Sequence, residues 1–264
     1  MVPGDHPAVV EPGAGAGTGS AAGGGSDGAD SHWVRWHQTY EDPSSRLSAR
    51  LRAVQSMLGD ALDEMPAGAE EIRVVSLCAG QGRDVIDVVA THPRGQAVSA
   101  LLVEQDPALV RFARTRAEAA GVGDRISVVE GDAAQSRLYA EVVPADVVLV
   151  CGVFGNISEA DITRTVHAMS GWCTPGGQVI WTRHRRPPDR TPAVRAMFAA
   201  AGFTEMAFVS PEGTIQGVGR HRLDGPDSDG PHSDGPDSDG AGSVVPFDPG
   251  QQLFDFVGDG VNPL

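Results

Sequence analysis

The sequence contains no lysine, and all 20 of its basic residues are arginines. This absence excludes a Schiff-base enzyme, a pyridoxal-phosphate enzyme and a Walker A nucleotide-binding site, because each of these needs a lysine amine. Cysteine is also scarce. The three cysteines are irregularly spaced, and none belongs to a Cys-x-x-Cys pair or a Cys/His cluster. We therefore expect neither a disulfide framework nor a bound metal.

Signals for export and for membrane insertion are missing as well. The N-terminus lacks the charged and apolar segments of a secretory signal, and no apolar run approaches the roughly 20 residues that a membrane-spanning helix needs. These absences favour a cytoplasmic protein without a membrane partner.

Acidic charge is abundant, but it is concentrated at the two ends of the chain. The formal net charge is −15, from 35 acidic and 20 basic residues. Residues 1–31 hold four acids and residues 224–264 hold nine, with no arginine in either segment. Residues 32–223 therefore carry 22 acids and 20 arginines. Because this body is nearly neutral and has no basic face, we expect no nucleic-acid partner.

Both ends of the chain have compositions typical of disorder. Residues 1–31 are rich in glycine and alanine, and residues 224–243 contain tandem GPDSDG repeats. Such segments cannot bury enough apolar surface to offset the entropy of ordering them, so we predict disordered tails at 1–31 and 224–264. The last stretch regains apolar residues, which leaves open whether it docks as a short peptide or frays; these are Phe247, Leu253, Phe254 and Phe256.

A helical segment is predicted over residues 32–70. Asp42 and Pro43 look like an N-cap followed by proline at the first helical position. The apolar residues that follow recur at helical spacing on one face; they are Leu47, Leu51, Val54, Leu58, Leu62 and Met65.

Between residues 71 and 223, short apolar runs alternate with helical patterns, which is typical of a parallel sheet covered on both faces. The predicted strands are 74–78, 98–104, 126–130, 145–151, 177–182, 205–210 and 214–223. The predicted helices are 83–91, 107–120, a short one after 133, 159–173 and 192–201. The turn at 211–213 is short enough only for an antiparallel pair. The sequence thus predicts an α/β, doubly wound, mostly parallel seven-stranded sheet with an antiparallel last strand.

Residues that could bind a nucleotide follow three of these strands in turn. Gly80 and Gly82 form a strand-to-helix turn where a ligand can approach the backbone. Glu104 ends the second strand, where a carboxylate can accept the ribose hydroxyls, and Asp132 follows the third, where it can accept from an adenine amino group. Three elements in this order predict a nucleotide-type ligand more strongly than any one of them.

With these motifs, residues 72–223 resemble the class I S-adenosylmethionine-dependent methyltransferases, whose first motif reads D-x-G-x-G-x-G. Ser76 stands at the leading acid and Cys78 at the first glycine, whereas Gly80 and Gly82 match. The resemblance implies S-adenosylmethionine as the cofactor and an N-terminal lid formed by residues 32–70. The cofactor-binding residues that it implies are Cys78, Ala79, Gly80, Gly82, Glu104, Gln105, Asp132, Ala133, Gly152 and Phe154.

A nicotinamide dinucleotide is the rival cofactor. Its fingerprint needs a glycine or alanine at the third position of G-x-G-x-x-G, where this chain has the larger Val85. The reversed end of the sheet also argues against it. We therefore favour the methyl donor.

The acceptor side offers candidates by residue type. His37, Tyr40 and His184 are candidate catalytic residues, because an imidazole or a phenol can take up a proton. Trp36 and Asn156 are candidate substrate-binding residues. Each has an ordinary alternative: helix packing for the aromatic segment, a turn for Asn156 and a surface position for His184. Phe154 is likewise open to a role in the core.

These observations predict transfer of a methyl group from S-adenosylmethionine to a small-molecule acceptor, through oxygen or nitrogen. The Asn-Pro-Pro-Tyr sequence of amino-base methyltransferases is absent after the fourth strand, where this chain reads CGVFGN. The alternative is a protein that binds S-adenosylmethionine or S-adenosylhomocysteine without catalysis. The sequence leaves the acceptor and the oligomeric state open.

Overall fold

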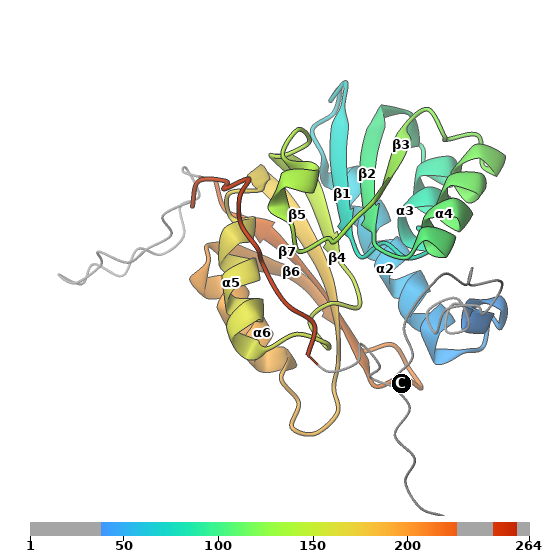
Figure 1. Cartoon of the computed structure of the whole chain (residues 1–264). Coiled ribbons are helices and arrows are strands. Elements are labelled where there is room, and N and C mark those ends of the chain that lie inside the picture. Colours follow the sequence, from blue (N-terminus) through green and yellow to red (C-terminus); the bar gives the residue numbers. More distant parts are fainter. Residues whose placement is uncertain (1–37, 226–244, 258–264) are drawn as a thin grey trace, which may run out of the picture. The chain divides into compact units, whose positions relative to one another are not determined.

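The computed structural model describes residues 38–225 and 245–257, and both ranges belong to one compact unit (Figure 1). Trp36 and His37 lie outside the described residues, as do the expected disordered segment 1–31 and residues 226–244 and 258–264. None of the helices that the structure describes is long and apolar enough to cross a membrane.

Seven strands form one sheet in the order β3-β2-β1-β4-β5-β7-β6. Neighbours among the first five strands pair in parallel, whereas β7 is antiparallel to both β5 and β6. The predicted doubly wound sheet with a reversed last strand is therefore confirmed. The strands are β1 (Ile72–Leu77), β2 (Val98–Glu104), β3 (Ile126–Glu130), β4 (Ala145–Val150), β5 (Cys173–His184), β6 (Phe203–Val209) and β7 (Gln216–Leu223).

Helices cover both faces of this sheet. Figure 1 shows α5 and α6 on one face and α2, α3 and α4 on the other, and a separate cluster of buried apolar side chains lies beneath each group. The α-helices are α2 (Arg46–Glu64), α3 (Arg83–Thr91), α4 (Pro107–Ala119), α5 (Glu159–Met169) and α6 (Thr191–Ala200), and the 3-10 helices are η1 (Gln38–Glu41), η2 (Gly95–Ala97) and η3 (Ser136–Tyr139).

Helix α2 begins three residues later than the sequence predicts. Its N-cap is Ser45, whose hydroxyl accepts a hydrogen bond from the backbone N–H of Ser48. Asp42 instead accepts from the backbone N–H and hydroxyl of Ser44, so it closes the preceding turn. The prediction of a cap at Asp42 is wrong because both residues are good caps, and only the path of the chain selects one of them.

Helix α5 ends earlier than predicted, at Met169 instead of residue 173. The N–H groups of Ser170, Gly171 and Trp172 bond to carbonyls three residues back, which tightens the end of the helix. The Trp172 carbonyl then accepts from the Ala145 N–H, so the chain has already joined the sheet.

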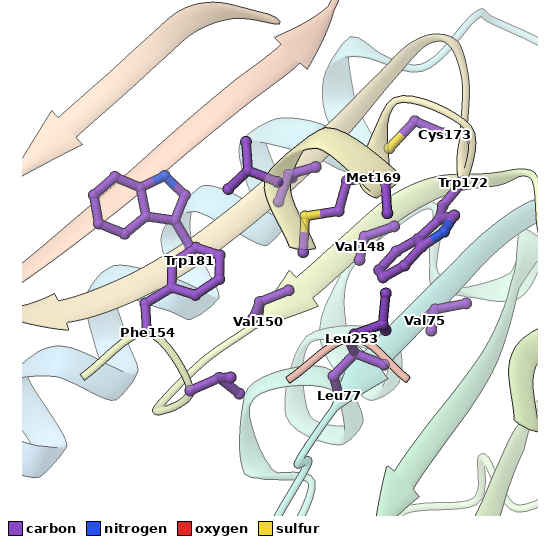
Figure 2. Packing of buried hydrophobic residues seen from close by; sticks show 14 of the residues in the cluster. Val75, Leu77, Val148, Val150, Phe154, Met169, Trp172, Cys173, Trp181 and Leu253 are labelled. Atoms are coloured by element: carbon purple, nitrogen blue, oxygen red, sulfur yellow. The ribbon is translucent and has the colours of Figure 1, made fainter. Parts of the chain in front are cut away.

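The crossover from β3 to β4 contains no α-helix, only η3. The C-terminal strap, residues 245–257, covers this part of the sheet. Its Leu253 and Phe254 are fully buried, and Figure 2 shows Leu253 beside Val75 and Leu77 of β1. The prediction of disorder throughout 224–264 is therefore wrong for the strap. Its apolar side chains fill the space that a crossover helix would otherwise occupy.

Removing the buried side chain of the strap tests its part in the core. We expect Leu253→Ala to lower the free energy of unfolding by about 2–5 kcal/mol, because it leaves a cavity against β1. Val257→Ala, at a strap residue that is 58% exposed, serves as the control and should change it by less than about 0.5 kcal/mol. Urea unfolding of the three proteins makes the comparison, and equal stabilities would contradict the core role.

Candidate functional site

The loops that follow the parallel strands meet at the carboxyl edge of the sheet. The strand order reverses beside β1, whose neighbours are β2 and β4. In open α/β sheets, ligands bind at such a switch point. The predicted cofactor residues follow β1, β2, β3 and β4, so the fold brings them to this edge.

The turn after β1 has an unusual backbone. Cys78, Gly80 and Gly82 all have positive φ angles, of 52°, 58° and 65°. A Cβ atom on Gly82 would lie 2.7 Å from side-chain carbons of Ile86 and of Leu102, so the turn lies tightly against α3 and β2. Cys78 adopts the left-handed region without being glycine, which costs about 1–2 kcal/mol. Burial, followed by the charges of Glu104 and Asp132, raises the pKa of its thiol, so Cys78 is a neutral group.

Glu104 connects the turn after β1 to the end of β2. One carboxylate oxygen accepts from the Gly80 N–H at 2.7 Å. The other accepts from the N–H groups of Gln105 and Asp106, both at 2.9 Å. Burial raises the pKa of this carboxyl, and the three hydrogen bonds oppose that shift. The oxygen that accepts from Gly80 has a second lone pair, which can accept from a ligand hydroxyl.

The loop after β3 joins the same group. The Gly131 N–H donates to the Glu104 carbonyl at 2.9 Å, and Asp132 accepts from the Ala134 N–H at 2.9 Å. Ala133 is buried, whereas the Asp132 side chain is half-buried. The structure thus brings the residues predicted after β1, β2 and β3 into one hydrogen-bonded edge.

The loop after β4 fixes the other side of the site. The Gly152 N–H donates to the Thr182 hydroxyl at 2.9 Å, and its carbonyl accepts from the Asn156 side-chain amide at 2.7 Å. Asn156 thus closes the turn, which is the alternative that the sequence leaves open. Phe154 is fully buried and contacts the rings of Trp181 and Phe198, so its ring belongs to the core. Its predicted contact with the cofactor has no support in this arrangement.

A buried polar cluster lies where α2 meets α3 and the end of β4; its members are Tyr40, Arg50, Asp84 and Cys151. The Arg50 guanidinium donates to the Tyr40 hydroxyl at 2.7 Å, and Arg50 is only 8% exposed. Burial raises the pKa of Asp84 to about 6, although Arg50 acts in the opposite direction. Burial also raises the pKa values of Tyr40 and Cys151. At neutral pH, Asp84 is therefore the ionised acid of the cluster.

Sequence reasoning missed Arg50. A usable signal was present, because position 50 is three residues after Leu47 and four before Val54, on the apolar face of the predicted helix. A charge on that face has to meet a partner in the interior.

His184 lies on the rim of the site, at the end of β5. A Cβ atom on Gly155 would be 3.1 Å from the His184 ring, so the imidazole packs over the loop after β4. Burial and the neighbouring guanidiniums of Arg183 and Arg186 lower its pKa, which keeps the imidazole neutral at pH 7. Among the described residues, no three His, Cys, Asp or Glu side chains gather into a group that could hold a metal.

Comparisons with known proteins agree with this geometry. Residues 45–200 match a family model described as "Putative methyltransferase". An O-methyltransferase family protein from Burkholderia thailandensis shares 17% identity at a TM-score of 0.52, over 73% of this chain and 63% of that one. Magnesium protoporphyrin IX methyltransferase from Synechocystis PCC 6803, solved with SAM bound, shares 13% identity at a TM-score of 0.56. The match covers 72% of this chain and 89% of that one. No curated protein matches the sequence.

The present chain spans less than two thirds of the Burkholderia protein's length. At these identities the structural likeness shows a shared fold. That fold is the α/β fold of the class I S-adenosylmethionine-dependent methyltransferases, as the resemblance implied.

Two glycine substitutions test how tightly the turn after β1 is packed. Gly82 and Gly121 have similar φ angles, of 65° and 69°, but nothing lies within 4 Å of a Cβ on Gly121. Gly82→Ala and Gly121→Ala therefore share the cost of the left-handed backbone. Only Gly82→Ala also forces a methyl group against neighbouring side chains. We expect it to lower the free energy of unfolding by about 1–3 kcal/mol more than Gly121→Ala does. Equal losses in urea unfolding would show that the turn has room to relax.

The pKa of Asp84 predicts a pH-dependent stability. Its carboxyl ionises at about 6 in the folded chain and at its ordinary value of 3.8 when unfolded, so the folded chain binds more protons between these values. The stabilising effect of the proton is complete below pH 3.8 and is lost as the pH rises through 6, about 3 kcal/mol in all.

Asp84→Asn removes this titration and keeps the side-chain oxygen that accepts from Val85. The unfolding free energy of the variant minus that of the parent should therefore rise by about 2 kcal/mol between pH 4 and pH 7. His221, whose pKa burial lowers to about 4, titrates in the same range but cancels in the difference. A flat difference would contradict the burial of an ionised Asp84.

Proposed function

The chain belongs to this methyltransferase family, and we propose that it transfers a methyl group from S-adenosylmethionine to an oxygen or nitrogen atom of a small-molecule acceptor. The observation that carries the proposal is the hydrogen-bonded edge formed by the loops after β1, β2 and β3. It presents a glycine turn, a buried carboxylate and a second acid in the order in which a nucleoside with a methionine tail would meet them.

The residues present fit this cofactor. A Cβ atom on Gly82 would clash with Ile86 and Leu102, so the glycine lets the turn pack closely against α3 and β2, beneath the place where the proposed cofactor would lie. In this proposal Glu104 accepts from the ribose hydroxyls and Asp132 from the adenine amino group, and backbone N–H groups hold both carboxylates in place. When bound, S-adenosylmethionine supplies an electrophilic methyl group on a positively charged sulfur.

The protein must align the acceptor and, for an oxygen or nitrogen acceptor, take up a proton. Among the described residues, ionised Asp84 in the buried cluster and neutral His184 on the rim can accept a proton at pH 7. Tyr40 does not suit this task, because burial raises the pKa of its phenol further above 10. We propose that the Tyr40–Arg50 pair anchors the acceptor by hydrogen bonding instead.

The charge of the chain supports the proposal of a small-molecule acceptor. The lysine-free body of the chain is nearly neutral, which supports a small molecule over a nucleic acid. All three cysteines lie among the described residues as free thiols, which supports the proposal of a cytoplasmic protein.

Calorimetric titration with S-adenosylmethionine, S-adenosylhomocysteine and NADH tests the cofactor. We expect micromolar affinity for both sulfur nucleotides, corresponding to about 8 kcal/mol, and no binding of NADH. Glu104→Gln should weaken binding at least tenfold, because it removes the charge that favours ribose hydroxyls. Its matched control is Glu130→Gln, since Glu130 lies opposite Glu104 on β3 but is exposed.

Two results would contradict this proposal or redirect it. Equal affinities in both glutamine variants would remove Glu104 from the cofactor site. Binding of both sulfur nucleotides without turnover across a broad screen of hydroxyl and amine acceptors would favour the non-catalytic binding protein.

A further inference from the structure

The C-terminal strap crosses two of the loops that form the candidate site. These loops, residues 131–136 and 152–157, follow different strands, β3 and β4. The strap lies more than 80 residues beyond both in the sequence, yet it bonds to each through its backbone. Figure 1 shows it running past η3 and alongside α5.

The first contact is with the loop after β3. The Leu253 N–H donates to the Ala134 carbonyl at 2.9 Å, and the Ser136 N–H donates to the Gln251 carbonyl at 3.1 Å. Ala134 is also the residue whose N–H the Asp132 carboxylate accepts, at 2.9 Å. Ala134 therefore links the strap directly to Asp132, the acid that we assign to the adenine.

The second contact is with the loop after β4. Phe256 forms a β-bridge with Ile157, and the Val257 N–H donates to the Asn156 carbonyl at 2.9 Å. The Asn156 side-chain amide in turn donates to the Gly152 carbonyl at 2.7 Å. A continuous series of hydrogen bonds thus leads from the strap to Gly152, beside the buried polar cluster.

A rigid anchor lies between these two contacts. Leu253 and Phe254 are buried in the core, and the Leu253 carbonyl accepts from Arg164 at 3.2 Å and from the Thr165 hydroxyl at 3.4 Å. The strap cannot slide along α5 without breaking this packing. Its outer end differs, because Phe256 and Val257 are 39% and 58% exposed, although the Phe256 ring still packs against that of Phe254.

We propose that the strap is a positioning element of the site: it couples the loop after β3 to the loop after β4, so that a nucleoside held by the first loop stiffens the second. This inference rests on the proposed function. The buried middle of the strap supports the fold, whereas the exposed outer end has the hydrogen bond to Asn156 as its specific contribution. Coupling of this kind needs a second loop that becomes measurably less mobile when the first is occupied.

Two variants at one exposed position separate coupling from folding. Val257→Pro removes the N–H that bonds to Asn156, whereas Val257→Ala keeps this N–H and only shortens an exposed side chain. Proline is compatible with the preceding Phe256, which is already extended in its bridge to Ile157. We expect the melting temperatures of the two variants to agree within about 3 °C, since this difference corresponds to less than about 1 kcal/mol in a chain of this size.

The readout is backbone hydrogen exchange with and without S-adenosylhomocysteine, over peptides covering 131–136 and 152–157. In the alanine variant, the nucleotide should slow exchange in both segments. In the proline variant, it should slow exchange in 131–136 as before, whereas the slowing in 152–157 should fall at least threefold.

The possible failures can be told apart. If the nucleotide slows exchange in 152–157 equally in both variants, the coupling through the strap is overturned while the proposed function stands. If the intact chain does not bind S-adenosylhomocysteine in calorimetry, the proposed function fails and the coupling fails with it.

Discussion

The buried carboxylate of Glu104 is the group on which the geometry of the candidate site depends. It accepts backbone hydrogen bonds from the turn after β1 and from the start of α4, while its own carbonyl receives the N–H of Gly131. Burying a carboxylate is costly unless donors surround it, and bonds to an ionised acceptor are about twice as strong as neutral ones. One residue therefore fixes three loops, and it leaves a charged edge for a ligand to meet.

The second constraint is the short crossover between β3 and β4. With only η3 in this connection, the apolar face of β1 would meet water unless another segment covered it. The strap covers it, which explains why Leu253 and Phe254 are as buried as the strands beneath them. Covering this face also brings the strap across the carboxyl edge, so packing and site geometry have one cause. The same segment can thus stabilise the fold and join two loops of the site.

These features also explain what the sequence could predict. Continuous apolar runs identified the five parallel strands, because burial on both faces produces this pattern, and the short turn at 211–213 identified the antiparallel pair that follows. The residues at the ends of β1, β2 and β3 followed, since parallel strands bring them to one edge. The apolar residues of the strap were recognised, but whether they dock stayed open, because the preceding acidic, glycine-rich sequence resembles a disordered tail and the strap contacts a gap that only the folded sheet reveals. The cap at Ser45 was missed because the local sequence permits several choices there, and tertiary contacts select among them. Arg50 was missed although its place on the apolar face of the predicted helix was a usable signal.

The two departures from the methyltransferase motif can be understood in the same terms. Ser76 is buried in β1, and within the described part of the chain its hydroxyl makes no hydrogen bond. Cys78 takes a backbone conformation that suits glycine. Neither residue holds the turn in place. Glu104 does so through the Gly80 N–H, and Gly82 does so by lying against α3 and β2. The motif can therefore vary at its first two positions, because the contacts that shape the turn come from the positions that it keeps.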